Sequence, residues 1–237
     1  MSQKNIAIVS GVGQGFGEAV CTQLSRAGYH VVGLARTMKI LSNLEETLTD
    51  EGGAFTGVTC NLLDEHSILQ AFNTIKGLDA PISAYIHNAG QFVMDDFFNL
   101  SAQAFEETWR LTTWSAFVCA QHILPHMVKQ GSGTIIFTGA TASIRGASKF
   151  ATFASAKFAL RGLAQSLARE FGPQGVHIVH AVLDGVVDCD WTKARFGISA
   201  DKALLPEAIA QNYLALINQH RSTWTHELDL RPDVERF

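Results

Sequence analysis

Cysteine is scarce in this chain: four residues stand far apart among 237, and no two form a C-x-x-C pair. That scatter argues against a disulfide framework and a structural zinc site, which use recognisable cysteine spacings. Reduced thiols are the simplest interpretation, and they are typical of the cytoplasm. We therefore expect a cytoplasmic protein without a structural metal.

An excess of basic side chains is also missing. The 18 lysines and arginines are outnumbered by 22 acidic residues, and the pI is about 6.1. A nucleic-acid partner usually needs a basic face, so none is expected. No apolar run approaches the ~18 residues of a membrane span, and residues 1–11 do not read as a signal peptide. We expect no membrane partner.

What the chain does contain is a regular alternation of short apolar runs and longer helical patterns. Several runs are rich in valine and isoleucine, as strands buried on both faces of a parallel sheet are. The alternation predicts an α/β fold with a doubly wound parallel sheet of about seven strands and helices on both faces. Residues 1–237 show no linker or repeat and are expected to form one domain. The expected strands lie at 5–11, 30–36, 54–60, 82–90, 133–139, 176–183 and 225–230.

The clearest helix begins near residue 151. Phe153, Lys157 and Leu160 step by four and three, which places them on one helix face. Gly172-Pro173 should end this helix, because proline cannot continue it. Pro206 is suited to the first turn of another helix.

A glycine-rich loop, SGVGQGFG at residues 10–17, follows the first expected strand and opens a helix. Its glycines permit a tight turn and let the backbone approach a pyrophosphate closely. Amides at the helix N-terminus would face the negative charge. A tight turn without any ligand is the alternative, but the position directly after the first strand favours a dinucleotide.

Further motifs follow later strands in order. His87-Asn88-Ala89-Gly90 follows the fourth, and Asp184-Gly185-Val186-Val187 follows the sixth. With the glycine loop and Lys157, they make the chain resemble the short-chain dehydrogenase/reductase family almost end to end. The resemblance implies a Rossmann fold and a nicotinamide dinucleotide site. Its implied cofactor residues are Gly11, Gln14, Gly15, Phe16, Gly17, Arg36, Asn61, Leu62, Asn88, Ala89, Gly90, Lys157, Gly185 and Val187.

The end of the second strand bears on the choice of cofactor. NAD sites usually place an acid there for the ribose 2′-hydroxyl, whereas an arginine suits a 2′-phosphate. This strand ends in Ala35 and Arg36, so NADP(H) is favoured over NAD(H), with a solvated arginine as the alternative. Gln14 weakens the preference, because many NADP-dependent relatives carry a basic residue there. Asn61 could bond the adenine.

The catalytic positions of the family carry unusual residues. A tyrosine donates the proton there, a lysine one turn later holds the ribose, a serine polarises the carbonyl and an asparagine organises a water relay. The resemblance keeps only Lys157, and places Phe153, Ala140 and Thr112 at the other three positions. Phenylalanine has no exchangeable proton. The three tyrosines, Tyr29, Tyr85 and Tyr213, lie outside the segment around Lys157.

Other groups near these positions allow two interpretations each. Arg145 and Lys149 could attract an anionic substrate or belong to a solvated loop. Asp184 could act as an acid or base if its pKa were raised, or could bond a loop amide. The nearby hydroxyls are expected to cap backbone groups rather than replace the tyrosine. These hydroxyls belong to Thr138, Thr141, Ser143 and Ser155.

Two further features of the sequence allow a functional and a structural interpretation. His122 and His126 have a spacing that can hold a metal, but Pro125 lies between them and surface histidines are commoner. Residues 188–205 follow the sixth strand and could form a substrate lid. Trp191 and Phe196 would then supply an apolar face, although simple packing explains them equally well.

Three functions remain compatible with these residues. The first is an oxidoreductase with a non-standard proton path, acting on an unknown small molecule. The second is a catalytically inactive dinucleotide-binding sensor or partner subunit, and the third is an interaction protein without cofactor. The retained glycine loop and Lys157 disfavour the third. The resemblance also implies a homodimer or homotetramer, formed through helices near 104–130 and 151–172.

Overall fold

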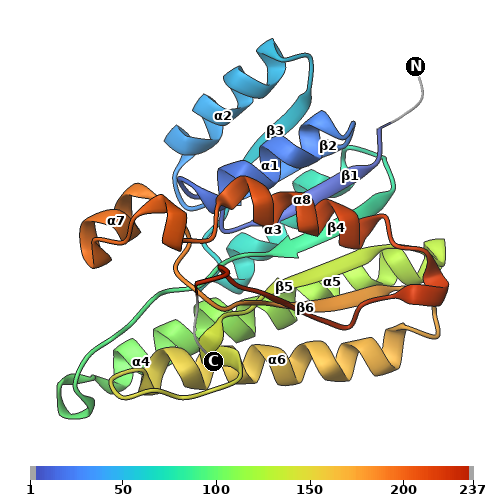
Figure 1. The fold of residues 1–237 in the computed structure, drawn as a ribbon. Helices are drawn as coiled ribbons and strands as arrows, with labels where there is room; N and C mark the ends of the chain where they lie inside the picture. The colour runs from blue at the N-terminus through green and yellow to red at the C-terminus, as the bar shows by residue number, and fades with distance from the viewer. Residues whose placement is uncertain (1–3, 235–237) are drawn as a thin grey trace.

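The computed structural model describes residues 4–234 and has a parallel sheet at its centre (Figure 1). Seven strands follow the order β3-β2-β1-β4-β5-β6-β7, and every neighbouring pair is parallel. This confirms the predicted doubly wound sheet. The strands are β1 (Ile6–Ser10), β2 (His30–Ala35), β3 (Ala54–Thr59), β4 (Ile82–His87), β5 (Thr134–Thr138), β6 (His177–Leu183) and β7 (Glu227–Leu230).

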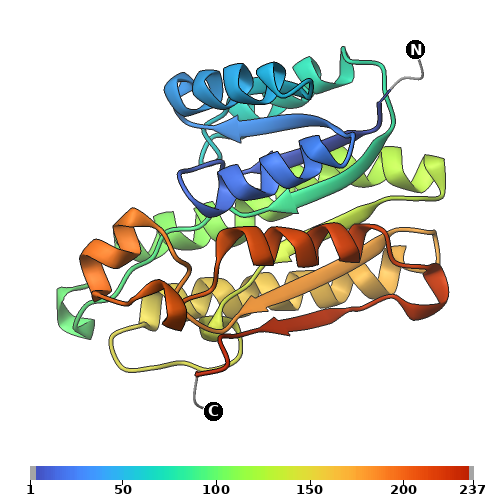
Figure 2. The same ribbon diagram turned by 45° about the horizontal axis from the view of Figure 1, so that its top comes forward.

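Helices cover both faces of the sheet, as Figure 2 shows. On one face, α1 (Phe16–Arg26), α2 (Met38–Asp50) and α8 (Pro206–Ile217) share a core with β1 and β2. On the other, α3 (Glu65–Lys76), α5 (Ser115–Gln130) and α6 (Ala151–Phe171) share a second core with β4 and β5. Strands apolar on both sides therefore separate two hydrophobic layers.

The sequence accounts for the helices through their apolar spacing. In α2, Leu41, Leu44 and Leu48 are buried at steps of three and four, and the remaining surface is largely exposed. Pro206 opens α8 at its first position, as predicted. The longest helix, α6, ends at Phe171, directly before Gly172-Pro173.

The helix expected near 104–130 has an interruption. It consists of α4 (Ala102–Trp109), a π-helical segment η2 (Arg110–Trp114) and α5. The wider turn places Thr112 and Thr113 against the interior, where Thr113 Oγ1 donates to the Ala156 carbonyl of α6 at 2.8 Å. Such π segments often occur at functional sites. Among the helices that the structure describes, none has the length and apolar character needed to cross a membrane.

The order of the strands fixes where a ligand can bind. β1 lies between β2 and β4, so the chain leaves β1 in one direction and later returns to its other side. At such a switch point the loops after neighbouring strands separate and leave a crevice at the carboxyl edge of the sheet. The segment 188–205 lies beside this edge and holds α7 (Asp190–Phe196) and η4 (Ala200–Lys202) (Figure 1).

Candidate functional site

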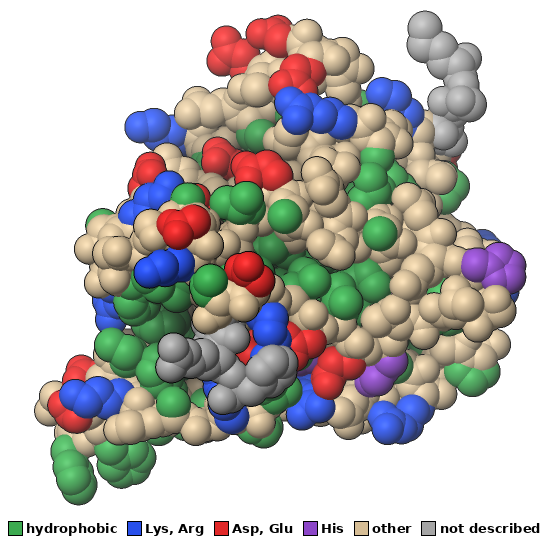
Figure 3. Space-filling view, viewed as in Figure 1, with side chains coloured by type: hydrophobic (Ala, Val, Ile, Leu, Met, Phe, Trp, Pro, Cys, Tyr) green, Lys and Arg blue, Asp and Glu red, His purple; other side chains and the backbone are tan. Residues whose placement is uncertain are grey.

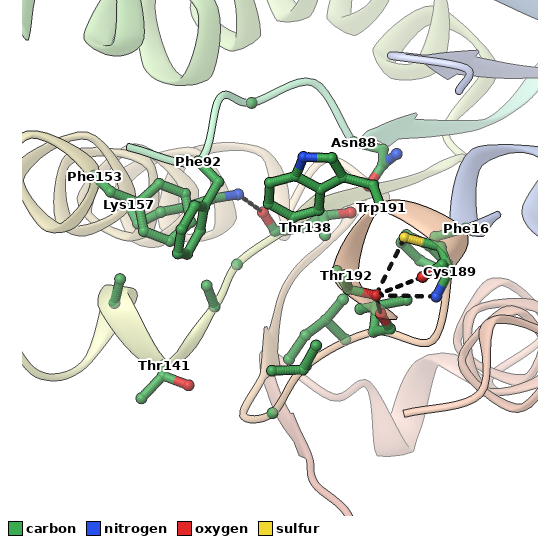
Figure 4. A pocket seen from close by; sticks show the side chains of 18 of the residues that line it. Phe16, Asn88, Phe92, Thr138, Thr141, Phe153, Lys157, Cys189, Trp191 and Thr192 are labelled. Carbon is green, nitrogen blue, oxygen red and sulfur yellow. Dashed lines mark hydrogen bonds between the residues drawn. The ribbon is translucent and has the colours of Figure 1, made fainter. Parts of the chain in front are cut away.

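A cavity of about 780 Å³ opens at the carboxyl edge of the sheet. Its walls come from the glycine loop, the loops after β4, β5 and β6, the first turns of α6, and α7. Figure 4 shows Phe92, Phe153 and Trp191 around the space, with Lys157 extending toward Thr138. The glycine loop and the motifs after β4 and β6 thus lie around one cavity.

The glycine loop needs glycine where it approaches other backbone. Gly11 has φ +79°, and a Cβ there would lie 2.7 Å from Ala89 Cα. Gly15 has φ +85°, and its Cβ would lie 2.8 Å from Cys189 Cβ. A larger residue at either position would combine backbone strain with a steric clash. The loop therefore packs tightly against the segments that follow β4 and β6.

A buried polar network holds the end of β4 against β1. The Asn88 side-chain amide donates to the Gly11 carbonyl at 3.1 Å. Beneath it, His87 lies within hydrogen-bond distance of Ser10 Oγ, Tyr85 Oη and the Thr112 carbonyl. Burial, aided by the positive charge of Lys157, lowers the pKa of His87 to about 3. His87 is thus neutral and structural rather than a proton donor at neutral pH.

Lys157 brings its ammonium group to the floor of the cavity. It is 5% exposed, and its Nζ donates to the Thr138 carbonyl at the end of β5 at 2.7 Å. Burial lowers the pKa of Lys157 to about 8, because the charged form loses its hydration. One helical turn earlier, Phe153 lines the cavity, and its ring centroid lies 5.8 Å from Nζ. An ammonium thus faces a ring without a hydroxyl.

Thr112 lies behind this floor. Its Oγ1 is buried and has no hydrogen-bond partner among residues 4–234. A Cβ added to Gly90 would lie 3.6 Å from both Thr112 Oγ1 and Lys157 Nζ, so the two polar atoms converge on Gly90. Thr112 does not itself line the cavity, whereas Gly90 does.

The wall after β5 carries few polar side chains. Ala140 presents a methyl group to the cavity, and its backbone N–H donates to Ser143 Oγ at 3.1 Å. Ser155 Oγ donates to the Ala151 carbonyl, so the predicted backbone bonding is confirmed for both serines. The prediction of backbone bonding is wrong for Thr138 and Thr141, whose hydroxyls bond other side chains. Thr138 Oγ1 pairs with Tyr213 Oη at 3.1 Å, and Thr141 Oγ1 donates to Asp184.

Asp184 contacts other side chains rather than the loop amide considered for it. Its buried carboxylate accepts the Thr141 hydroxyl at 2.5 Å and lies 3.3 Å from an Arg231 nitrogen and 3.7 Å from an Arg145 nitrogen. Charge-assisted contacts of this kind hold a side chain in place. Asp184 fixes the loop before α6 to the segment after β7, which no sequence motif indicated.

Aromatic rings close the far side of the cavity. Phe92, in the loop after β4, lies 5.3 to 5.7 Å from four other rings, measured between centroids. Arg195 lies 5.4 Å above the Phe92 ring. Hydrophobic side chains reach the surface just below α7 (Figure 3). The four rings around Phe92 belong to Phe150, Phe153, Trp191 and Phe196, and the five rings together are called the aromatic wall below.

The segment that carries two of these rings is anchored at its base. Val187 and Leu204 form a parallel β-bridge. Asp188 N–H donates to the Leu204 carbonyl and Leu204 N–H to the Val186 carbonyl, each at 2.8 Å. The two ends of the segment between Val187 and Leu204 therefore lie side by side, as the two ends of a lid would. Trp191, in the first turn of α7, is half exposed.

The cavity brings together most of the residues predicted to bind the cofactor. Arg36, Asn61 and Leu62 lie outside it, at the ends of β2 and β3. Three more predicted residues contact the lining without belonging to it: Gly15, Ala89 and Thr112. The predicted residues that line it are Gly11, Gln14, Phe16, Gly17, Asn88, Gly90, Ala140, Phe153, Lys157, Gly185 and Val187.

Some lining residues carried no usable sequence signal. Phe92 stands alone in a loop without periodicity, although it is the centre of the aromatic wall. Cys189 faces Gly15 and its Sγ lies 3.4 Å from Thr192 Oγ1.

Of the two histidines considered as metal ligands, His122 stacks against Phe72, with ring centroids 5.0 Å apart.

Known proteins resemble this chain over nearly its whole length. A family model described as short chain dehydrogenase matches residues 5–197. A short-chain dehydrogenase/reductase of Armillaria gallica is 30% identical over 185 residues, which cover 75% of this chain and 69% of that protein. The 3-oxoacyl-(acyl-carrier-protein) reductase FabG of Aquifex aeolicus is 29% identical over 212 residues, covering 89% and 81%.

A solved structure matches the arrangement of these elements as well. The crystal structure of a short-chain dehydrogenase from Rhodopseudomonas palustris superposes with a TM-score of 0.84 at 30% identity. The match covers 97% of this chain and 99% of that one.

The buried ammonium predicts a pH-dependent stability difference between wild type and Lys157→Met. The folded pKa of Lys157, about 8, lies below its ordinary 10.5. Between these values the unfolded chain binds the extra proton, so stability rises with pH. The wild type should gain up to about 3 kcal/mol relative to the variant across that range, at 1.36 kcal/mol per pKa unit. Urea unfolding from pH 7 to 10.5 measures it.

The matched control is Lys129→Met, because Lys129 is exposed in the last turn of α5. Its stability difference from wild type should stay constant over the same pH range. A constant difference for Lys157→Met as well would contradict the burial of a charged group at this position.

Proposed function

The chain belongs to the short-chain dehydrogenase family, and from that premise we propose that it is an NADP(H)-binding oxidoreductase with a non-standard proton path. The dinucleotide would lie along the cavity from the glycine loop to Lys157. The cofactor would supply hydride chemistry, and the protein would hold and orient it. Lys157, with Asn88 and Gly90 nearby, would hold the nicotinamide ribose.

One observation carries the proposal. The cavity keeps the elements that would hold the cofactor, but a phenyl ring and a methyl group stand at Phe153 and Ala140. We place these two residues at the positions of the family's tyrosine and serine. Within the described chain, none of the three tyrosines lines the cavity. Losing a positioned proton donor typically costs 10²–10⁴ in rate, so ordinary ketone reduction should be slow.

NADP(H) is the proposed cofactor because of the end of β2. Gly11 and Val12 N–H both donate to the Leu34 carbonyl at 3.0 Å, which brings the glycine loop beside that strand end. The next residues are Ala35, without a carboxylate, and the exposed Arg36. A guanidinium there would meet the 2′-phosphate with paired donors.

A second function is supported by the same absence of a phenol. A chain that binds dinucleotide but lacks a proton donor would serve as a sensor or as a partner subunit. The lid segment and its aromatic wall favour the enzyme, because a sensor of the cofactor alone has no need for an enclosed apolar space beyond the lysine. Catalytic turnover of a substrate distinguishes the enzyme from the sensor or partner subunit.

We also propose that the chain assembles as a homodimer or homotetramer through α5 and α6. Phe117 and Phe158 are 44% and 43% exposed on the faces of these helices that point away from the sheet. Large exposed rings on neighbouring helices favour association. A cytoplasmic location suits the chain, since all four cysteines are unpaired thiols.

Arg36→Ala should weaken NADPH binding by about tenfold to a hundredfold, since a charge-assisted contact contributes about 1.5–3 kcal/mol. NADH affinity should change less than about twofold by the same reasoning, because NADH has no 2′-phosphate. Fluorescence titration of both cofactors measures the effect. Arg169→Ala, at the exposed far end of α6, is the control. Equal wild-type affinities for the two cofactors would refute the NADP preference.

Restoring the missing hydroxyls should restore ordinary ketone reduction. Phe153→Tyr combined with Ala140→Ser should raise kcat/KM on simple ketones by about 10²-fold or more, the typical value of positioned acid catalysis. NADPH oxidation at 340 nm with a ketone panel measures the gain. Unchanged rates with cofactor still bound would show that these positions do not face a substrate carbonyl.

Phe158→Glu should shift the assembly toward monomers, because a carboxylate would be buried without a partner at the interface. Sedimentation velocity compares it with wild type. Leu69→Glu changes a similarly exposed apolar residue on α3, 40% exposed, and should leave the mass unchanged. A monomeric wild type would contradict the proposed assembly.

A further inference from the structure

The aromatic wall defines the chemistry of the space beyond Lys157. Phe92 lies between rings from α6 and from α7, and its contacts with Phe150, Trp191 and Phe196 are edge-to-face. Flat rings are bound well by such walls, because edges and faces of aromatic rings attract each other at these spacings. The wall therefore favours a planar, conjugated molecule over a flexible one.

The charges around the wall argue against a cationic ligand. Aromatic cages often bind cations, but here two cations already lie over the rings: Arg195 is 5.4 Å from Phe92 and Lys157 is 5.8 Å from Phe153. Arg145 also lines the cavity, but its guanidinium lies 3.7 Å from the Asp184 carboxylate, which offsets its charge. None of the described residues that line the cavity is acidic, so Lys157 and Arg195 favour a neutral molecule that becomes an anion during the reaction.

The missing proton donor restricts the reaction further. Hydride addition to a ketone produces an alkoxide, whose conjugate acid is about as weak as water, with a pKa near 15.7. Hydride addition to a quinone produces a phenolate, whose conjugate acid has a pKa near 10, like that of tyrosine. The weaker base needs much less help from an acid in the transition state.

We propose that the substrate is a quinone, that is, a flat conjugated dicarbonyl reduced against the aromatic wall. This assignment rests on the proposed function, which supplies the dihydronicotinamide. The carbon–hydrogen bond at C4 of that cofactor breaks, and the hydride forms an O–H bond at one quinone oxygen. The electron pair passes through the ring to the other oxygen as phenolate. One solvent proton then completes the hydroquinone, and the cofactor leaves oxidised.

Lys157 has the position to assist this reaction without a tyrosine. Its ammonium lies beside Phe153 at the floor of the cavity, with only the Thr138 carbonyl as hydrogen-bond acceptor in the described chain. Its remaining N–H groups can stabilise a developing phenolate. Burial lowers the pKa of Lys157 to about 8, which suits it to relay the solvent proton to the product.

The experiment compares 1,4-naphthoquinone with 1-tetralone, which share a fused-ring skeleton but give a phenolate and an alkoxide. Cofactor dissociation constants are measured first by fluorescence. Wild-type kcat/KM, corrected for the uncatalysed rate, should be at least about 100-fold higher for the quinone. Phe153→Tyr should raise the tetralone value by about tenfold or more, and by a larger factor than the quinone value, since only the alkoxide needs the phenol.

Trp191→Ala tests the wall directly. It should raise the quinone KM at least about threefold by removing one ring contact, with cofactor affinity unchanged. Trp224→Ala is the control, because Trp224 stacks on His177 at the opposite end of β6. Bound cofactor without quinone turnover, or equal Phe153→Tyr effects on both substrates, would overturn the substrate assignment alone. Failure to bind either cofactor would overturn the proposed function with it.

Discussion

The hydrogen bond from Lys157 to the Thr138 carbonyl is the interaction around which the site is organised. It ties the second turn of α6 to the end of β5 and holds an ammonium group in a buried place. Burial disfavours that charge, as the lowered pKa of Lys157 shows. A buried apolar side chain would not carry this cost. Stability alone therefore does not explain a lysine at this position.

The ring of Phe153 changes what that ammonium faces. A phenol one turn before the ammonium would have its pKa lowered by that charge. With a phenyl ring there, the ammonium donates to the Thr138 carbonyl, and the orphaned hydroxyl of Thr112 converges with it on Gly90. The cavity is therefore polar at its glycine loop and floor and apolar at its wall. Binding of a charged cofactor and of an uncharged conjugated substrate would divide along that line.

The sequence predicted the sheet well and the site unevenly. Continuous apolar runs gave the strands, and the glycine loop and Lys157 were found because their chemistry depends on local spacing. Asp184 was misjudged, because Arg231 lies 47 residues later and only folding brings it near. Phe92 was missed for a similar reason: its loop has no periodicity, so its partners come entirely from tertiary structure. The π-helical turn at Thr112 likewise follows from packing against α6, which no propensity encodes.

The aromatic wall also sets how the proposed lid can work. The Trp191 and Phe196 rings touch Phe92, and each such pair contributes about 0.5–1.5 kcal/mol beyond simple burial. Opening the segment between Val187 and Leu204 must break both contacts, which together cost about 1–3 kcal/mol. A flat ligand that replaces these contacts would close the lid with little net loss, whereas an aliphatic one would leave the rings without their partners.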